Sequence, residues 1–157
     1  MSPSDRSPPD STRFAVLPDR GDAYPAATWL AQPGAKIVRH SSGRPWLVGW
    51  WPEDDITVGE AGSTRIALIG PSSISTSELT RFAGRLRDLA ELDQLARTLA
   101  GSFHLVGVLD GRIRVQGTAA GLRLVFHALM NGVTVAADRA DLLAEAIEAT
   151  PDQKQVA

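Results

Sequence analysis

The chain contains no cysteine. This absence excludes a disulfide framework, a thiolate metal site and a cysteine nucleophile. A surplus of charge of one sign is also missing, because 16 Lys and Arg residues are balanced by 18 Asp and Glu residues and no basic stripe is present. Sequence-independent affinity for phosphates needs clustered Lys and Arg, so we expect no nucleic-acid partner.

Long hydrophobic runs are absent too. No stretch of about 18 apolar residues occurs, and the N-terminus lacks the apolar centre of a signal peptide. We therefore expect no membrane partner and a cytoplasmic protein. Residues 1–13 are mostly Ser, Pro, Asp and Arg and predict a disordered arm, residues 149–157 predict a flexible tail, and residues 14–148 predict one domain.

The hydrophobic pattern between residues 14 and 148 alternates between a strand period and a helix period. A short helix is predicted over 24–30, two amphipathic segments follow between 75 and 99, and a last helix follows Asp138 as its cap. Ser75 and Glu78 have the spacing of a capping box at the start of the first amphipathic segment. Strands are predicted at 14–17, 36–40, 46–51, 56–58, 64–69, 103–109, 112–116, 122–129 and 133–137.

Turn residues join several of these strands in pairs. Asp110-Gly111 and Asn131-Gly132 each lie between apolar runs and predict type I′ hairpins. Residues 103–109 are apolar at every position except His104, which indicates a strand covered on both faces. The order of strands, helices, strands and helix predicts an α+β sandwich with mainly antiparallel sheets.

Three blocks of residues resemble the N-terminal domain of the asparagine-synthetase-like cyclases of lasso-peptide pathways. The resemblance covers residues 14–148 and includes the turn residues between the blocks. The blocks are HSSGRPWLVG at 40–49, GSFHLV at 101–106 with DGRIRVQGT at 110–118, and AADRAD at 136–141.

The resemblance implies an αββα sandwich of the N-terminal-nucleophile (Ntn) hydrolase type, with helices flanking two mainly antiparallel sheets. The family's full-length protein would be an ATP-dependent amide ligase that closes a macrolactam in a lasso peptide. ATP and Mg belong to a synthetase domain with a Ser-Gly-Gly-x-Asp-Ser loop, which this sequence lacks. The implied partners are that synthetase domain or subunit, with the lasso precursor peptide and leader peptidase as further candidates.

The sequence departs from a working glutaminase at three positions. The first strand begins at Phe14-Ala15, where the resemblance implies a nucleophilic cysteine with a free α-amine. Ile69-Gly70 stands where an Asn-Gly pair would bind the oxyanion, and Gln116-Gly117 replaces an Arg-Asp pair. Loss of one oxyanion donor costs a factor of about 100–1,000 in rate in other enzymes. We therefore predict no catalytic residue and a silent glutaminase-like domain.

Neither the histidines nor the Gly-rich segment has the pattern of a metal, hydrolase or phosphate site. His40, His104 and His127 lack the spacing of a zinc site, and satisfied strand or turn histidines are favoured over a metal centre or a Ser-His-Asp hydrolase. The Gly-rich segment 117–121 lacks a following helix and a P-loop lysine, so a tight connection is favoured over a phosphate site. Arginines at 81, 85 and 87 indicate a solvated helix face.

Three tryptophans lie close together and raise the question of a stacking platform for a ligand. Strand alternation predicts Trp46 and Trp50 on one face, as core residues, and Trp51 on the other. Trp51 precedes Pro52 and three acidic residues, and is the candidate partner contact. An exposed apolar patch that includes Trp51 or the outer face of strand 122–129 is expected to meet the synthetase domain.

Two other classes of function stay open at this point. One is a stand-alone peptide- or protein-binding module. The other is a self-processed hydrolase, in which cleavage before Ser11 or Thr12 would free a hydroxyl nucleophile with its own α-amine.

Overall fold

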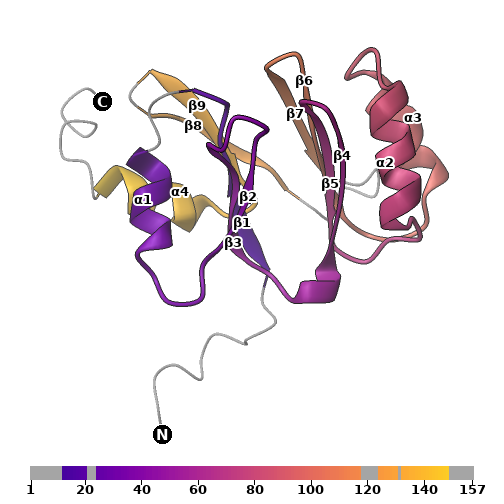
Figure 1. Cartoon of the computed structure of the whole chain (residues 1–157). Coiled ribbons are helices and arrows are strands. Elements are labelled where there is room, and N and C mark those ends of the chain that lie inside the picture. The colour runs from indigo at the N-terminus through magenta and orange to yellow at the C-terminus, as the bar shows by residue number, and fades with distance from the viewer. Residues whose placement is uncertain (1–11, 21–23, 118–123, 131, 149–157) are drawn as a thin grey trace, which may run out of the picture.

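The structure is a computed structural model that describes residues 12–20, 24–117, 124–130 and 132–148. Within these residues the chain forms two antiparallel sheets between two helical layers (Figure 1). The predicted arm and tail fall outside the described residues, apart from Thr12 and Arg13. None of the helices in this part of the chain has the length and apolar character needed to cross a bilayer.

The first sheet contains five strands, and the second contains four. In spatial order, the first sheet is β2 (Lys36–Arg39), β3 (Pro45–Trp50), β1 (Arg13–Val16), β9 (Val133–Ala137) and β8 (Phe126–Met130). The second is β4 (Ile56–Ala61), β5 (Thr64–Ile69), β6 (His104–Leu109) and β7 (Arg112–Gly117).

Helices cover the outer face of each sheet. The helices α1 (Tyr24–Leu30) and α4 (Ala140–Glu148) pack on the first sheet, while α2 (Thr76–Arg85) and α3 (Glu91–Thr98) pack on the second. The layer order is therefore helix, sheet, sheet, helix, and the predicted α+β sandwich with antiparallel sheets is confirmed.

Side-chain alternation along β1 explains how the layers hold together. Phe14 and Val16 point into the space between the sheets, whereas Ala15 points toward α1 and α4. All six residues of β6 are buried, as expected for a strand covered on both faces. A third cluster packs the buried stripe of α2 and α3, with Leu79 and Leu92 fully buried, onto the second sheet.

Short sequence motifs correctly predicted the start of one helix and one of the hairpin turns. Ser75 and Glu78 form both hydrogen bonds of the capping box at the start of α2. Asp110 and Gly111 have φ angles of 51° and 78°, the positive values that a type I′ turn requires, and join β6 to β7. The predicted strand over 122–129 is shorter in the structure, where β8 begins at Phe126 and residues 118–123 lie outside the described residues.

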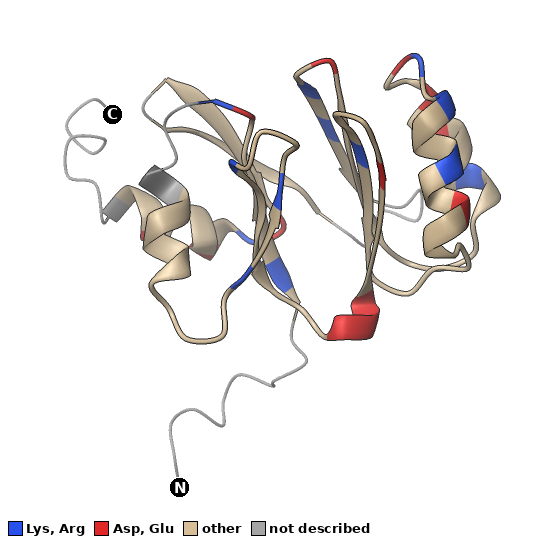
Figure 2. Ribbon diagram, in the orientation of Figure 1, with Lys and Arg blue, Asp and Glu red and all other residues tan. Residues whose placement is uncertain are grey.

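Figure 2 shows acidic residues gathered at the short 3₁₀ helix η2 (Glu53–Asp55) between β3 and β4. Arg81, Arg85 and Arg87 are exposed, which confirms the predicted solvated face of this helical region. Arg65 is a buried exception in β5: its guanidinium donates hydrogen bonds to the carbonyls of Gly62 and Arg39, and so links the two sheets.

Candidate functional site

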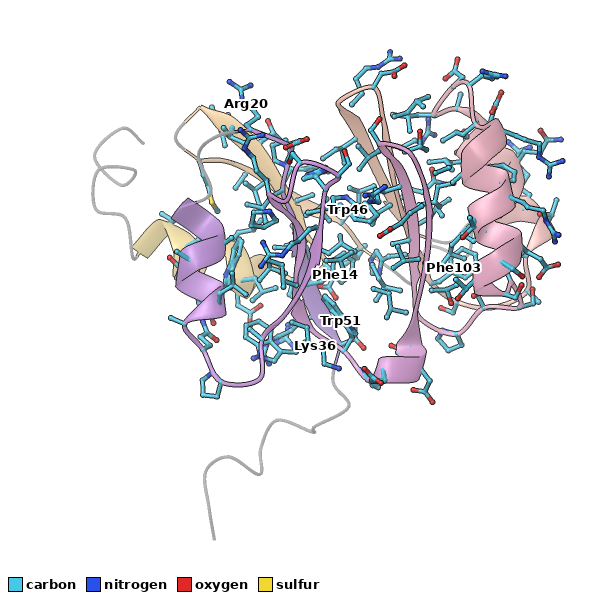
Figure 3. All side chains as sticks on the ribbon, viewed as in Figure 1. Phe14, Arg20, Lys36, Trp46, Trp51 and Phe103 are labelled. Carbon is cyan, nitrogen blue, oxygen red and sulfur yellow. The ribbon has the colours of Figure 1, made fainter. Side chains whose placement is uncertain are left out.

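The space between the sheets is filled at the end where β1 begins. Phe14 is fully buried there, and its ring meets the ring of His104 edge-on, with 5.1 Å between the centroids. Trp51 and Ile69 belong to the same buried cluster as Phe14. Figure 3 shows Phe14 and Trp51 between the two sheets, where the resemblance implies a nucleophile and its substrate. We call this region, formed by Phe14, Trp51, Ile69 and His104, the closed end.

Trp51 was predicted as the candidate partner contact within an exposed apolar patch, but the structure buries it, so the expected exposure is wrong. Its side chain is only 6% exposed and packs between the sheets. The chain leaves β3 at Trp50 and turns toward η2, which carries the Trp51 ring inward. The ammonium of Lys36 donates a 2.6 Å hydrogen bond to the Trp51 carbonyl and fixes this turn.

The other two tryptophans also differ from the predicted alternation. Trp46 is fully buried between the sheets, while Trp50 packs against the outer cluster next to the helices. The pairing of β2 with β3 shifts register between Val38 and Arg39, opposite Trp46, which breaks the simple alternation. Trp50 donates its indole N–H to the Pro33 carbonyl, and the Arg13 guanidinium lies 4.1 Å from its ring centroid.

The position expected to bind an oxyanion has no free donor. Ile69 is fully buried and pairs with Ile56 on one side and His104 on the other. The following residue, Gly70, donates its backbone N–H to the Asp55 carbonyl at 2.7 Å. Because the side chain is apolar and the backbone N–H is engaged, neither group is available to stabilise negative charge on a substrate.

Asp138 fastens the start of β1 to the end of β9. Its Oδ1 atom accepts a 2.8 Å hydrogen bond from the Phe14 N–H, and its own N–H donates to the Phe14 carbonyl. Burial raises the pKa of the Asp138 carboxyl to about 6, although the hydrogen bond from Phe14 and the nearby Arg139 act in the opposite direction. The predicted role as cap of the last helix is wrong by position, since α4 begins two residues later, at Ala140.

The hydroxyl nearest the head of β1 belongs to Thr12. It donates a 2.8 Å hydrogen bond to the Asp55 carboxylate, the same residue whose carbonyl holds Gly70. A carboxylate acceptor holds this hydroxyl in place, but a self-processed hydrolase would also need an oxyanion donor, and Ile69 and Gly70 supply none.

The histidines do not converge. His40 Nε2 lies 2.9 Å from the Leu17 carbonyl, and His104 Nε2 lies 2.8 Å from the Leu124 carbonyl, whereas His127 is exposed in β8. Within the described residues, no group of three or more His, Asp or Glu side chains is arranged to hold a metal ion. Gln116, at the third departure from the glutaminase pattern, accepts a hydrogen bond from Arg114.

The opposite end of the same inter-sheet space is hollow. A cavity of about 430 Å³ lies between the β6–β7 turn at Gly111 and the β8–β9 turn at Gly132. Its walls come from both sheets and are mostly aliphatic, with Arg20, His127 and Thr134 as the polar residues. We call this region the open end. The sequence predicts no cavity here, although it predicts an exposed apolar patch that includes Trp51 or the outer face of strand 122–129. The available signal is Thr134 and His127, polar residues inside strands that are otherwise apolar.

Comparisons of the chain with protein-family models, with curated proteins and with solved structures found no match. The likeness to lasso-peptide cyclases therefore rests on the residue blocks themselves. Any functional assignment must be argued from those blocks and from the two ends of the inter-sheet space.

Proposed function

We propose that this chain is a catalytically silent glutaminase-like domain of a lasso-peptide macrolactam synthetase. In this role it supports an ATP-dependent, isopeptide-forming synthetase domain and performs no glutamine hydrolysis itself. The helix–sheet–sheet–helix order of layers supports an Ntn-type ancestry, because it matches the architecture that the resemblance implies.

The observation that carries the proposal is the packing at the closed end. An Ntn glutaminase needs a nucleophile at the head of its first strand and room beside it for glutamine. Here Phe14 occupies the strand, its ring contacts His104, and Trp51 fills the neighbouring space. A site packed with aromatic side chains cannot admit a polar substrate without losing that packing.

The residue blocks that carry the resemblance also support a structural role. Residues 40–49 form the β2–β3 turn and most of β3, and 101–106 enter the buried strand β6. Residues 136–141 contain Asp138, whose carboxylate holds the Phe14 N–H. These blocks build the layers and the closed end, and a structural role is consistent with that placement.

The predicted absence of glutaminase activity is tested with glutamine and with an electrophilic analogue of glutamine. We expect no ammonia release from glutamine above the heat-inactivated control. We also expect no mass increase after incubation with 6-diazo-5-oxo-L-norleucine, which alkylates Ntn nucleophiles. A glutaminase with an N-terminal cysteine serves as the positive control for both assays.

The same intact-mass measurement tests the self-processed hydrolase. The chain should keep its full mass, with no species that begins at Ser11 or Thr12. If cleavage or an adduct is found, Thr12→Val separates the causes, because it removes the hydroxyl that bonds Asp55 and keeps a β-branched side chain of similar size. Loss of the signal in this variant would establish a threonine nucleophile and refute the silent domain.

The supporting role is tested with the synthetase domain supplied as a separate chain. We expect the two chains to co-elute in size-exclusion chromatography and macrolactam formation to need both. Thr12→Val should leave this ligation unchanged, since no chemistry takes place at the closed end. Equal ligation rates with and without this chain would refute the supporting role.

A further inference from the structure

The open end has the features of a binding site. Val16, Ile113, Val115 and Ala136 supply its aliphatic walls, and the cavity volume of about 430 Å³ falls within the range of about 300–1,000 Å³ for ligand sites. The aliphatic walls reach the cavity from both sheets, so a bound ligand would lie between them.

Among the described residues that line the open end, Arg20 and His127 are the titratable ones, and none of these lining residues is acidic. In the described part of the chain, neither side chain takes part in an ion pair or a hydrogen bond. A cationic side chain without a partner at the rim of a cavity with mixed polar and aliphatic walls favours a ligand with a carboxylate.

The acidic neighbours do not neutralise this charge. Asp19 precedes Arg20, but its carboxylate accepts hydrogen bonds from Ser42 and Arg44. These bonds lower the pKa of Asp19, with Ser42 the larger cause, so this carboxylate is ionised and engaged away from Arg20. Asp110 lies next to the Gly111 turn, but it lines a different cavity, beside α2.

Each sheet ends at the cavity with an edge strand. Among the described residues β7 pairs only with β6, and β8 pairs only with β9. Leu129 lies two residues after His127 on the same face of β8 and is 68% exposed, so the apolar surface continues beyond the cavity. Extended peptides bind beside edge strands through backbone hydrogen bonds and insert alternate side chains into nearby pockets.

We propose that the open end binds a short extended peptide segment with aliphatic side chains and one carboxylate, with Arg20 and His127 at the rim as the recognition groups. The site is separate from the closed end. Its test uses the chain alone, without glutamine or a synthetase domain, so its outcome is independent of the supporting role proposed above.

The probes are three synthetic peptides added to the ¹⁵N-labelled chain. The first is acetyl-Val-Leu-Val-Asp-amide, the second is its neutral match acetyl-Val-Leu-Val-Asn-amide, and the third is acetyl-Val-Leu-Val with a free C-terminal carboxylate. We expect saturable shifts in the amide signals of Val16, Val115 and Thr134 with the first and third peptides. The tighter of these two identifies whether a side-chain or a terminal carboxylate is preferred.

One set of variants tests the contribution of the Arg20 charge to binding, and a second set tests whether binding needs the free volume of the cavity. Arg20→Gln should weaken binding of the two acidic peptides by at most about fivefold, the upper limit for a solvent-exposed ion pair, and leave the affinity for the neutral match unchanged. The matched control is Arg112→Gln, an equal loss of charge on the exposed first residue of β7, outside the cavity wall. This control should leave all three affinities unchanged.

Filling the cavity should abolish binding. Thr134 is exposed on β9 and lines the cavity, so Thr134→Trp adds an indole there without disturbing the buried core. Arg112→Trp controls for added bulk, and thermal melting confirms that both variants fold.

Three outcomes would overturn the proposal. The first is the absence of saturable shifts at the open end with all three peptides. The second is equal affinity for the acidic and neutral peptides. The third is a concentration-dependent shift of the same signals without any peptide, which would show that a second copy of the chain covers the open end.

Discussion

The two ends of the inter-sheet space both include strand β1, yet one is a core and the other is a cavity. At the closed end β1 contributes Phe14, which has no exposed surface, and Trp51 fills the space beside it. At the open end β1 contributes Val16, and its neighbours there include the small residues Thr134 and Ala136. The volume of the side chains, and not the layer architecture, decides which end of the inter-sheet space contains a cavity.

The polar groups at the two ends also differ in whether they have hydrogen-bond partners. At the closed end the carboxylates are engaged: Asp138 accepts from the Phe14 N–H, and Asp55 accepts from the Thr12 hydroxyl. At the open end the rim carries cationic or neutral side chains, Arg20 and His127, that have no partner within the described residues. The first arrangement stabilises the fold, whereas the second leaves recognition groups available to a ligand.

The largest expected effect comes from emptying the closed end. Trp51→Ala removes a side chain that packs between the sheets and leaves a void, so we expect a loss of about 3–5 kcal/mol in the free energy of unfolding. Urea denaturation followed by circular dichroism measures it. Leu129→Ala is the control from the open side, where 68% exposure predicts a change within about 0.5 kcal/mol. Similar losses in the two variants would remove the distinction between the ends.

The next effect concerns the contribution of Asp138, which is hydrogen-bonded to Phe14, to the pH dependence of the free energy of unfolding. The pKa of this carboxyl is about 6 in the fold and near 3.8 in the unfolded chain, so the unfolded state loses its proton first as pH rises. Stability from this group is therefore greatest below pH 4 and falls between pH 4 and 6, by about 3 kcal/mol at most.

Asp138→Asn isolates this effect from the other carboxyls. The asparagine oxygen still accepts from the Phe14 N–H, but it does not titrate. The stability of Asp138→Asn relative to the parent chain should therefore increase between pH 4 and 7. Urea denaturation at a series of pH values measures it. A relative stability that is constant across this interval would show that the buried carboxyl keeps its ordinary pKa.

Local chemistry made much of the fold predictable from the sequence. The capping box of Ser75 and Glu78 and the positive φ angles at Asp110 and Gly111 are set by neighbours a few residues away, and the structure contains both. The antiparallel sandwich followed from such turns and from the change of hydrophobic period. Element ends moved by a few residues at most, as with β2, which ends at Arg39.

Two of the failures involve contacts that the neighbouring sequence does not reveal. Asp138 looked like a helix cap because a helix follows it, but its carboxylate binds Phe14, 124 residues away. Trp51 looked exposed because acidic residues follow it, but the Lys36 ammonium and the turn into η2 direct it inward. The cavity at the open end depends on how the two sheets pack against each other. Polar residues such as Thr134 and His127 indicate only that the inner faces of their strands are not fully buried.

The last comparison makes the same isoleucine-to-alanine substitution at both ends, and the smallest expected loss is the one at the open end. Ile69→Ala removes a fully buried side chain from the closed end, where the void cannot refill, so we expect a loss of about 2–5 kcal/mol. Ile113→Ala removes a half-buried side chain that lines a cavity already present. No new closed void forms, and only the apolar surface is lost, which predicts about 1 kcal/mol. Urea denaturation of both variants measures the difference. Equal losses would show that the open end is packed as a core, and would remove the space that a peptide needs.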